Sequence, residues 1–120
     1  MAQLFLTVTL NQDRQERFQI DTLASDGSVA TPDGGVQGIT VDSGAAEMVV
    51  DTEADASGLQ VVYKSDLSAT EFPSSSQITS FIDARQGPDV VKLEIIATVV
   101  TLAKEAQSLN ARSLGNEARA

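Results

Sequence analysis

Residues 90–102, VVKLEIIATVVTL, determine the fold class of this 120-residue chain. Alternate residues of this stretch form one apolar row: Val91, Leu93, Ile95, Ala97 and Val99. Successive side chains of a strand point to opposite faces, so a period of two predicts a long β-strand. Lys92 and Glu94 indicate that the other face begins in water. That face becomes apolar at Ile96, Val100 and Leu102, and we expect its far half to be covered.

Six more strands are predicted before this one. They correspond to alternating or β-branched segments at residues 3–10, 16–22, 36–41, 46–51, 59–64 and 77–83. Turns rich in Gly, Pro, Asp and Ser separate them, and helical periodicity is absent before residue 100. This pattern predicts an all-β, antiparallel sandwich of two sheets, with a small barrel as the competing architecture.

One domain and a tail are expected. A hydrophobic content of 42% supplies a single core, and an aromatic content of 4% makes that core aliphatic. The composition changes to good helix formers after residue 103, and Gly115 is placed to end a short helix. We therefore expect a sandwich over residues 1–103. Residues 104–120 are expected to form a C-terminal tail, either a helix laid on a neighbouring molecule or a flexible segment.

Charge and composition exclude several classes of function. The net charge of -9 disfavours binding to nucleic acid and to anionic membranes. With no Cys and no His, the chain cannot build a disulfide, a thiolate or imidazole catalyst, or a zinc site. The start of the sequence lacks a secretory signal pattern, and no stretch reaches the length of an apolar membrane span. We expect a protein without cofactor or enzymatic activity that is made in a cytoplasm.

An acidic region offers the one candidate metal site. No basic residue occurs between Arg17 and Lys64, whereas many acidic residues do. Asp51, Glu53 and Asp55 are spaced by two, as at the opening of a calcium-binding EF-hand loop. The Gly and the closing Glu of that loop are missing, and three alternating side chains also fit a solvated acidic face. The sequence favours the solvated face over calcium.

Other chemical motifs are incomplete. Paired carboxylates hydrolyse glycosides, but a sugar cleft needs aromatic rings beyond one Tyr and four Phe. The glycine-rich stretch 33–38 lacks the Lys of a phosphate-binding loop, so we interpret it as a turn or a bulged hairpin. Residues 70–76 are interpreted as a plain linker. Tyr63 is either a corner residue bonded to the backbone or, as we favour, an ordinary strand residue.

The apolar outer half of the last strand is the candidate partner interface. Ile96, Val100 and Leu102, continued by Leu109 in the tail, indicate the seam of a homo-oligomer, a dimer or a trimer. A cap formed by the chain's own tail would explain the same residues, but the seam is favoured.

The order of these signals resembles the immunoglobulin-like modules of tailed-bacteriophage virion proteins. The resemblance covers roughly residues 3–102 and is carried by these segments: Leu6-Thr7-Val8-Thr9-Leu10-Asn11, Phe18-Gln19-Ile20-Asp21, Asp33-Gly34, Ala56-Ser57-Gly58-Leu59 and Val91-Lys92-Leu93-Glu94-Ile95. The Cys pair and the Trp of antibody-type domains are absent. The resemblance implies an immunoglobulin-like β-sandwich on the virion surface.

The same resemblance implies a non-enzymatic structural role. The chain would be a decoration or cement protein that binds the major capsid protein through loops, edge strands or the C-terminal arm. Many weak contacts repeated by symmetry suffice for that role. The alternative is an immunoglobulin-like adhesin or tail accessory module that binds cell-surface carbohydrate, with or without calcium.

Overall fold

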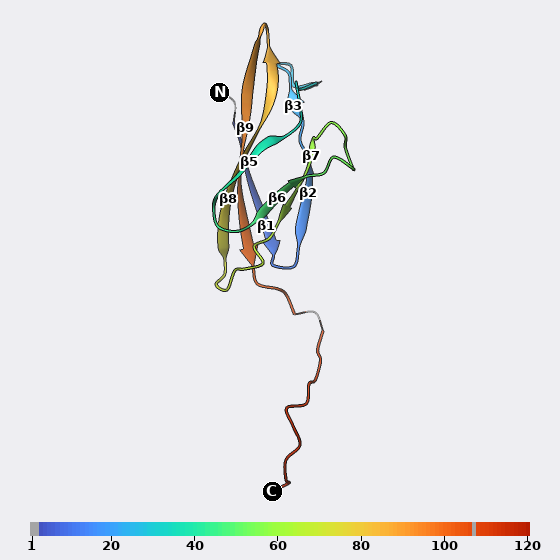
Figure 1. Ribbon diagram of the computed structural model, residues 1–120, viewed down its shortest axis with the longest axis vertical. Coiled ribbons are helices and arrows are strands. Elements are labelled where there is room, and N and C mark those ends of the chain that lie inside the picture. Colours follow the sequence, from blue (N-terminus) through green and yellow to red (C-terminus); the bar gives the residue numbers. More distant parts are fainter. Residues whose placement is uncertain (1–2, 107) are drawn as a thin grey trace.

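The computed structural model describes residues 3–106 and 108–120 (Figure 1). The strands are β1 (Gln3–Asn11), β2 (Gln15–Gln19), β3 (Thr22–Leu23), β4 (Val29–Ala30), β5 (Gln37–Ser43), β6 (Glu47–Val50), β7 (Gln60–Lys64), β8 (Ser74–Gln86) and β9 (Asp89–Leu102). The described residues contain no helix, so the prediction of an all-β fold is confirmed. No helix forms in the described part of residues 104–120 of the free chain, and a helix laid on a neighbouring molecule stays a prediction. Gln107, which also falls in the predicted helix, lies outside the described residues.

The strands form two larger sheets and one small one. The orders are β1-β9-β8-β5 in the four-stranded sheet, β2-β7-β6 in the three-stranded sheet and β3-β4 in the two-stranded sheet. All pairs are antiparallel except β1 and β9, which run parallel over the whole of β1. The expectation of a purely antiparallel fold is therefore wrong for this pair. Parallel strands need a long crossover, and here everything between the first and last strands supplies it.

One hydrophobic core takes residues from both larger sheets. Its buried members are Val8, Leu10, Ile20, Val36, Ala46, Met48, Val61, Tyr63, Ile78, Ile82, Ile95, Ala97 and Val99. They come mainly from the inward rows of β1, β8 and β9 on one side and of β6 and β7 on the other. This arrangement is consistent with a β-sandwich. The four-stranded sheet ends at β1 and β5 and does not close on itself, which argues against the barrel.

Seven strands were predicted, and the short β3 and β4 are additional; two of the predicted strands have ends that are wrong by three residues. The strand predicted over residues 16–22 ends at Gln19, and Thr22 belongs to the short β3. The strand predicted over residues 77–83 extends over Ser74–Gln86. The first three residues of this strand are serines. The Ser76 hydroxyl is nevertheless buried, and it accepts a hydrogen bond from the backbone N–H of Ala46 at 3.1 Å. Apolar periodicity could not predict the beginning of this strand, because the buried residue there is a serine.

The connection from β7 to β8 is fixed to the rest of the body mainly by the side chain of Gln12. The Nε2 atom of Gln12, in the turn between β1 and β2, donates to the backbone carbonyls of Asp66, Leu67 and Ala69 at 3.1, 3.1 and 2.9 Å. The backbone N–H of Asp66 also donates to the Thr101 hydroxyl at 2.9 Å. The polar connection is thus an ordered loop held against the end of the sandwich.

Residues 103–106 and 108–120 extend away from the body (Figure 1). They are exposed and carry no regular secondary structure, and the longest dimension of the molecule is 84 Å against 26 and 22 Å. The Nδ2 atom of Asn11 donates to the Ala103 carbonyl at 2.7 Å, where this segment leaves β9. Within the described residues, no helix is long and apolar enough to cross a membrane.

Candidate interaction surfaces

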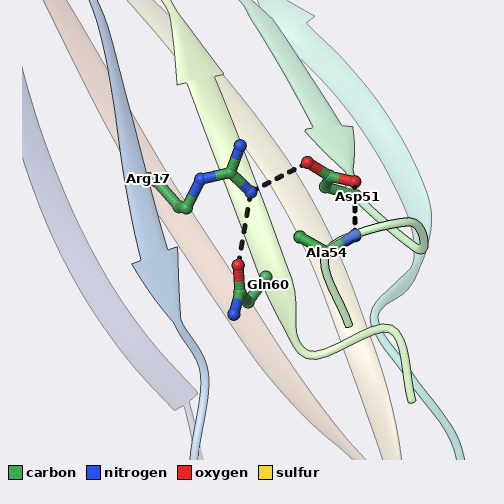
Figure 2. A network of polar contacts seen from close by, with 4 residues as sticks. All are labelled: Arg17, Asp51, Ala54 and Gln60. Atoms are coloured by element: carbon green, nitrogen blue, oxygen red, sulfur yellow. Dashed lines mark hydrogen bonds and ion pairs between the residues drawn. The ribbon is translucent and has the colours of Figure 1, made fainter. Parts of the chain in front are cut away.

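Asp51, the first of the candidate calcium ligands, is engaged by protein groups. Its Oδ2 atom lies 2.9 Å from Nη1 of Arg17, and its Oδ1 atom accepts the backbone N–H of Ala54 at 3.0 Å (Figure 2). The same Arg17 nitrogen reaches Oε1 of Gln60 at 3.3 Å. The hydrogen bond from Ala54 and then the contact with Arg17 hold the pKa of Asp51 below its usual value. Both oxygens of this carboxylate are therefore occupied.

Asp55, the third candidate, is engaged by Ser57. Its Oδ1 atom accepts both the hydroxyl of Ser57 at 2.5 Å and the backbone N–H at 3.0 Å, and these bonds lower its pKa. Glu53 is exposed between the two aspartates. In the part of the chain that the structure describes, no three acidic side chains form a group able to hold a metal ion. The structure does not bring Asp51, Glu53 and Asp55 together around one point.

The same Asp-x-Ser turn occurs three times. In each copy, the Asp Oδ1 atom accepts the backbone N–H and the hydroxyl of the Ser two residues later, in the pairs Asp26–Ser28, Asp55–Ser57 and Asp66–Ser68. An aspartate that bonds its own loop in this way stabilises a turn without any ligand. The sequence contains three Asp-x-Ser triplets that correspond to these turns, and the calcium hypothesis, which used only the spacing of acidic residues, did not consider them. Part of the acidic region is therefore turn-forming.

The apolar face predicted on β9 exists in the structure. Ile96 and Val100 are half-buried, and Leu102 is 37% exposed. The parallel register places Phe5 of β1 opposite Ile96, and Phe5 is 71% exposed. Phe5 was not predicted as an interface residue, because it is the one apolar side chain in the otherwise polar outward row of residues 3–10. The sheet thus presents an apolar strip that runs from Phe5 along β9 to Leu102.

Leu109, the fourth predicted interface residue, is separate from that strip. Its side chain is fully exposed, and the segment that carries it points away from the body (Figure 1). Leu114 is likewise 89% exposed. The chain's own tail therefore does not cover the apolar strip, and the interpretation of the strip as an intramolecular cap site is wrong. Two exposed leucines in an extended segment remain available to another molecule.

On the same face of the sheet, an aromatic ring covers the surface of β8 and β5. Phe81 of β8 lies against Gly38 of β5, where a Cβ atom would come within 2.2 Å of the ring. Gly38 has a φ of 67°, which favours glycine in any case. On the other side, the ammonium of Lys92 lies 4.3 Å from the centre of the Phe81 ring, a cation–π contact. On this face, Phe81 and Lys92 cover the surface beside Gly38, whereas Phe5 of β1 and Leu102 of β9 remain exposed.

Tyr63 lies in the hydrophobic core and is not part of any of the surfaces described above. It is fully buried in β7 and meets the Phe18 ring edge to face, with centroids 5.9 Å apart. Its hydroxyl has no hydrogen-bond partner within the described residues, and burial raises its pKa to about 12. The interpretation as a strand residue is confirmed, whereas a corner residue would donate to the backbone.

No family model, curated protein or solved structure matches the chain. The surfaces described above therefore carry the functional argument by themselves.

Proposed function

We propose that this chain is a non-enzymatic structural protein of a tailed-bacteriophage virion, which decorates or cements the capsid by binding the major capsid protein. In this proposal the body is an immunoglobulin-like domain, residues 104–120 are its C-terminal arm, and the protein resides on the virion surface as a dimer or trimer. The partner interface comprises Ile96, Val100, Leu102 and Leu109.

The order of the strands supports the immunoglobulin-like assignment. An immunoglobulin constant-type domain has strands C, F and G in one sheet and strands B, E and D next to one another in the other. Here β5, β8 and β9 have the relation of C, F and G, and β2, β7 and β6 have that of B, E and D. The first strand departs from this scheme, because β1 pairs with β9 instead of β2. A β-sandwich of this kind presents loops, edges and one sheet face for binding.

The observation that carries the proposed role is the apolar strip next to an exposed arm. The strip ends at Leu102, where the arm begins, so both can contact one partner at the same time. Arms that extend from a folded body add contact area at little cost to the fold of that body. The chain contains neither His nor Cys, and its only tyrosine is buried, which fits binding better than catalysis.

Co-sedimentation with capsids tests the proposal. The full chain is mixed with capsids assembled from the major capsid protein of the same genome, and binding is measured by pelleting through a sucrose cushion. We expect saturable binding that is weakened both by removal of residues 104–120 and by Val100→Asp. Val49→Asp is the control, because Val49 is an exposed valine on β6 of the other sheet.

Two results would contradict the proposal. One is a chain that remains in the supernatant at every capsid concentration. The other is binding to cell-surface glycans that is lost on chelation of calcium while capsids are ignored, which would favour the adhesin.

A further inference from the structure

The first strand, β1, is an unprotected edge. It is one of the two outer strands of the four-stranded sheet, and in the described part of the chain only β9 pairs with it. An edge strand presents a row of unpaired backbone N–H and C=O groups, which another strand can bind. Natural proteins protect such edges with charged residues, proline or β-bulges.

The other edges of the two larger sheets have such protection, whereas β1 has none. β5, at the far edge of the same sheet, carries two register shifts in its pairing with β8. β2 carries Glu16 and Arg17, and β6 begins with the charged Glu47. In contrast, β1 reads QLFLTVTLN, nine residues without charge or proline, and its register with β9 is continuous. Among these edge strands, β1 is therefore the one best suited to pair with another strand.

The first half of β1 is the exposed half. Leu4 is 46% exposed and Phe5 is 71% exposed, whereas Val8 and Leu10, further along the strand, are buried. An apolar cleft of about 230 Å³ lies between this half of β1 and the segment that joins β2 to β3. Its apolar lining consists of Leu4, Ile20, Leu23, Ile82, Leu93 and Ile95. A strand added to β1 would therefore cover apolar surface on both faces of the sheet.

We propose that β1 of a second copy occupies this edge, so that two chains pair antiparallel about Phe5 and their four-stranded sheets join into one. A two-fold axis makes the edge its own complement, because wherever residue i of one strand faces residue j of the other, residue j faces residue i across the axis. Phe5 then faces Phe5 of the second copy on the outer face, and Leu4 faces Leu6 beside the cleft.

The chemistry of the edge favours a second copy over the chain's other segments. Residues 104–120 are rich in Ala, Glu, Lys, Asn and Gly, which are depleted in strands, so the arm is a weak candidate for this place. The net charge of -9 makes two copies repel each other, and β1 offers an approach that brings no charged side chains together. The dimer should accordingly become tighter as salt concentration rises.

The test uses the isolated full chain, so it does not depend on the capsid assignment. Sedimentation velocity should find a dimer for the natural sequence and a monomer for Phe5→Lys. This substitution lowers the net negative charge, so general electrostatics predict the opposite effect. Val49→Lys, an exposed valine on the edge strand of the other sheet, should leave the dimer intact.

A cysteine variant tests the register. The chain has no cysteine, so Phe5→Cys should yield a disulfide-linked dimer under mild oxidation, while Val49→Cys should yield far less. A natural chain that stays monomeric at millimolar concentration in high salt would overturn the inference. A dimer that survives Phe5→Lys but dissociates in Val49→Lys would overturn it as well. If the dimer forms and capsids are ignored, only the proposed function fails.

Discussion

Removing the buried hydroxyl of Tyr63 should stabilise the protein. The ring is fully buried against Phe18, but its hydroxyl has no hydrogen-bond partner in the described residues. A buried polar group without a partner costs about 1–3 kcal/mol, because it loses its bonds to water and gains none. Tyr63→Phe keeps the ring and its contact with Phe18. We expect the free energy of unfolding to rise by about 1 kcal/mol, the lower end of that range, since a small void remains.

The effect should grow at high pH. Burial raises the pKa of Tyr63 from its ordinary 10.0 to about 12. Between these two values the unfolded chain releases the phenolic proton while the folded chain retains it, so stability falls as pH rises and is unaffected below the lower value. The full difference corresponds to at most about 2.7 kcal/mol. At the upper value itself the loss is about 2 kcal/mol, because half of the folded tyrosine has also released its proton.

The assay is urea unfolding followed by far-ultraviolet circular dichroism, which does not depend on the tyrosine itself. The natural sequence and Tyr63→Phe are compared at neutral pH and at several values above 10. Because Tyr63 is the chain's only tyrosine, its tyrosinate absorbance reports its ionisation directly in the folded state. The reasoning is refuted if Tyr63→Phe is less stable by 1 kcal/mol or more, or if the folded tyrosine titrates at its ordinary pKa.

Three further changes test other parts of the structure. Gln12→Ala should lower the free energy of unfolding by about 1–3 kcal/mol, because three loop carbonyls lose their donor; equal stability in urea unfolding would contradict this. Gly44→Ala should lower it by at least about 2 kcal/mol, since Gly44 has a φ of 76° and a Cβ would lie 2.1 Å from the Ser76 hydroxyl oxygen. Calorimetry of the Gly44→Ala protein would refute this if its melting temperature were unchanged. Deletion of residues 104–120 should change stability by less than about 0.5 kcal/mol, and a larger loss would mean that the arm packs on the body.

The strands of this protein were predictable wherever one face is apolar and the other polar. The pattern of residues 90–102 predicted β9 almost to its ends, because its inward row is uninterrupted. The beginning of β8 was not predictable in this way, since Ser76 is buried as a hydrogen-bond acceptor and looks like a loop residue. The two-residue strands β3 and β4 are too short to show any period. Local periodicity also says nothing of partners, so the parallel pairing of β1 with β9 was missed.

The candidate surfaces were predictable in part. Ile96, Val100 and Leu102 were found because apolar residues interrupt a polar row, and they do share one sheet face. Phe5 joins them only through the register of β1 with β9, a contact between opposite ends of the chain. The calcium hypothesis for Asp51, Glu53 and Asp55 rested on spacing alone. Spacing does not reveal that Arg17 and Ser57 already engage two of the three carboxylates.

Hydrogen exchange of the protein bound to capsids tests the central claim most directly. The account predicts protection, relative to the free protein, at the end of β9 and in residues 103–120, with exchange unchanged in the acidic loop that contains Asp51 and Asp55. Protection confined to that loop, with the end of β9 and the arm exchanging as in the free protein, would contradict the account.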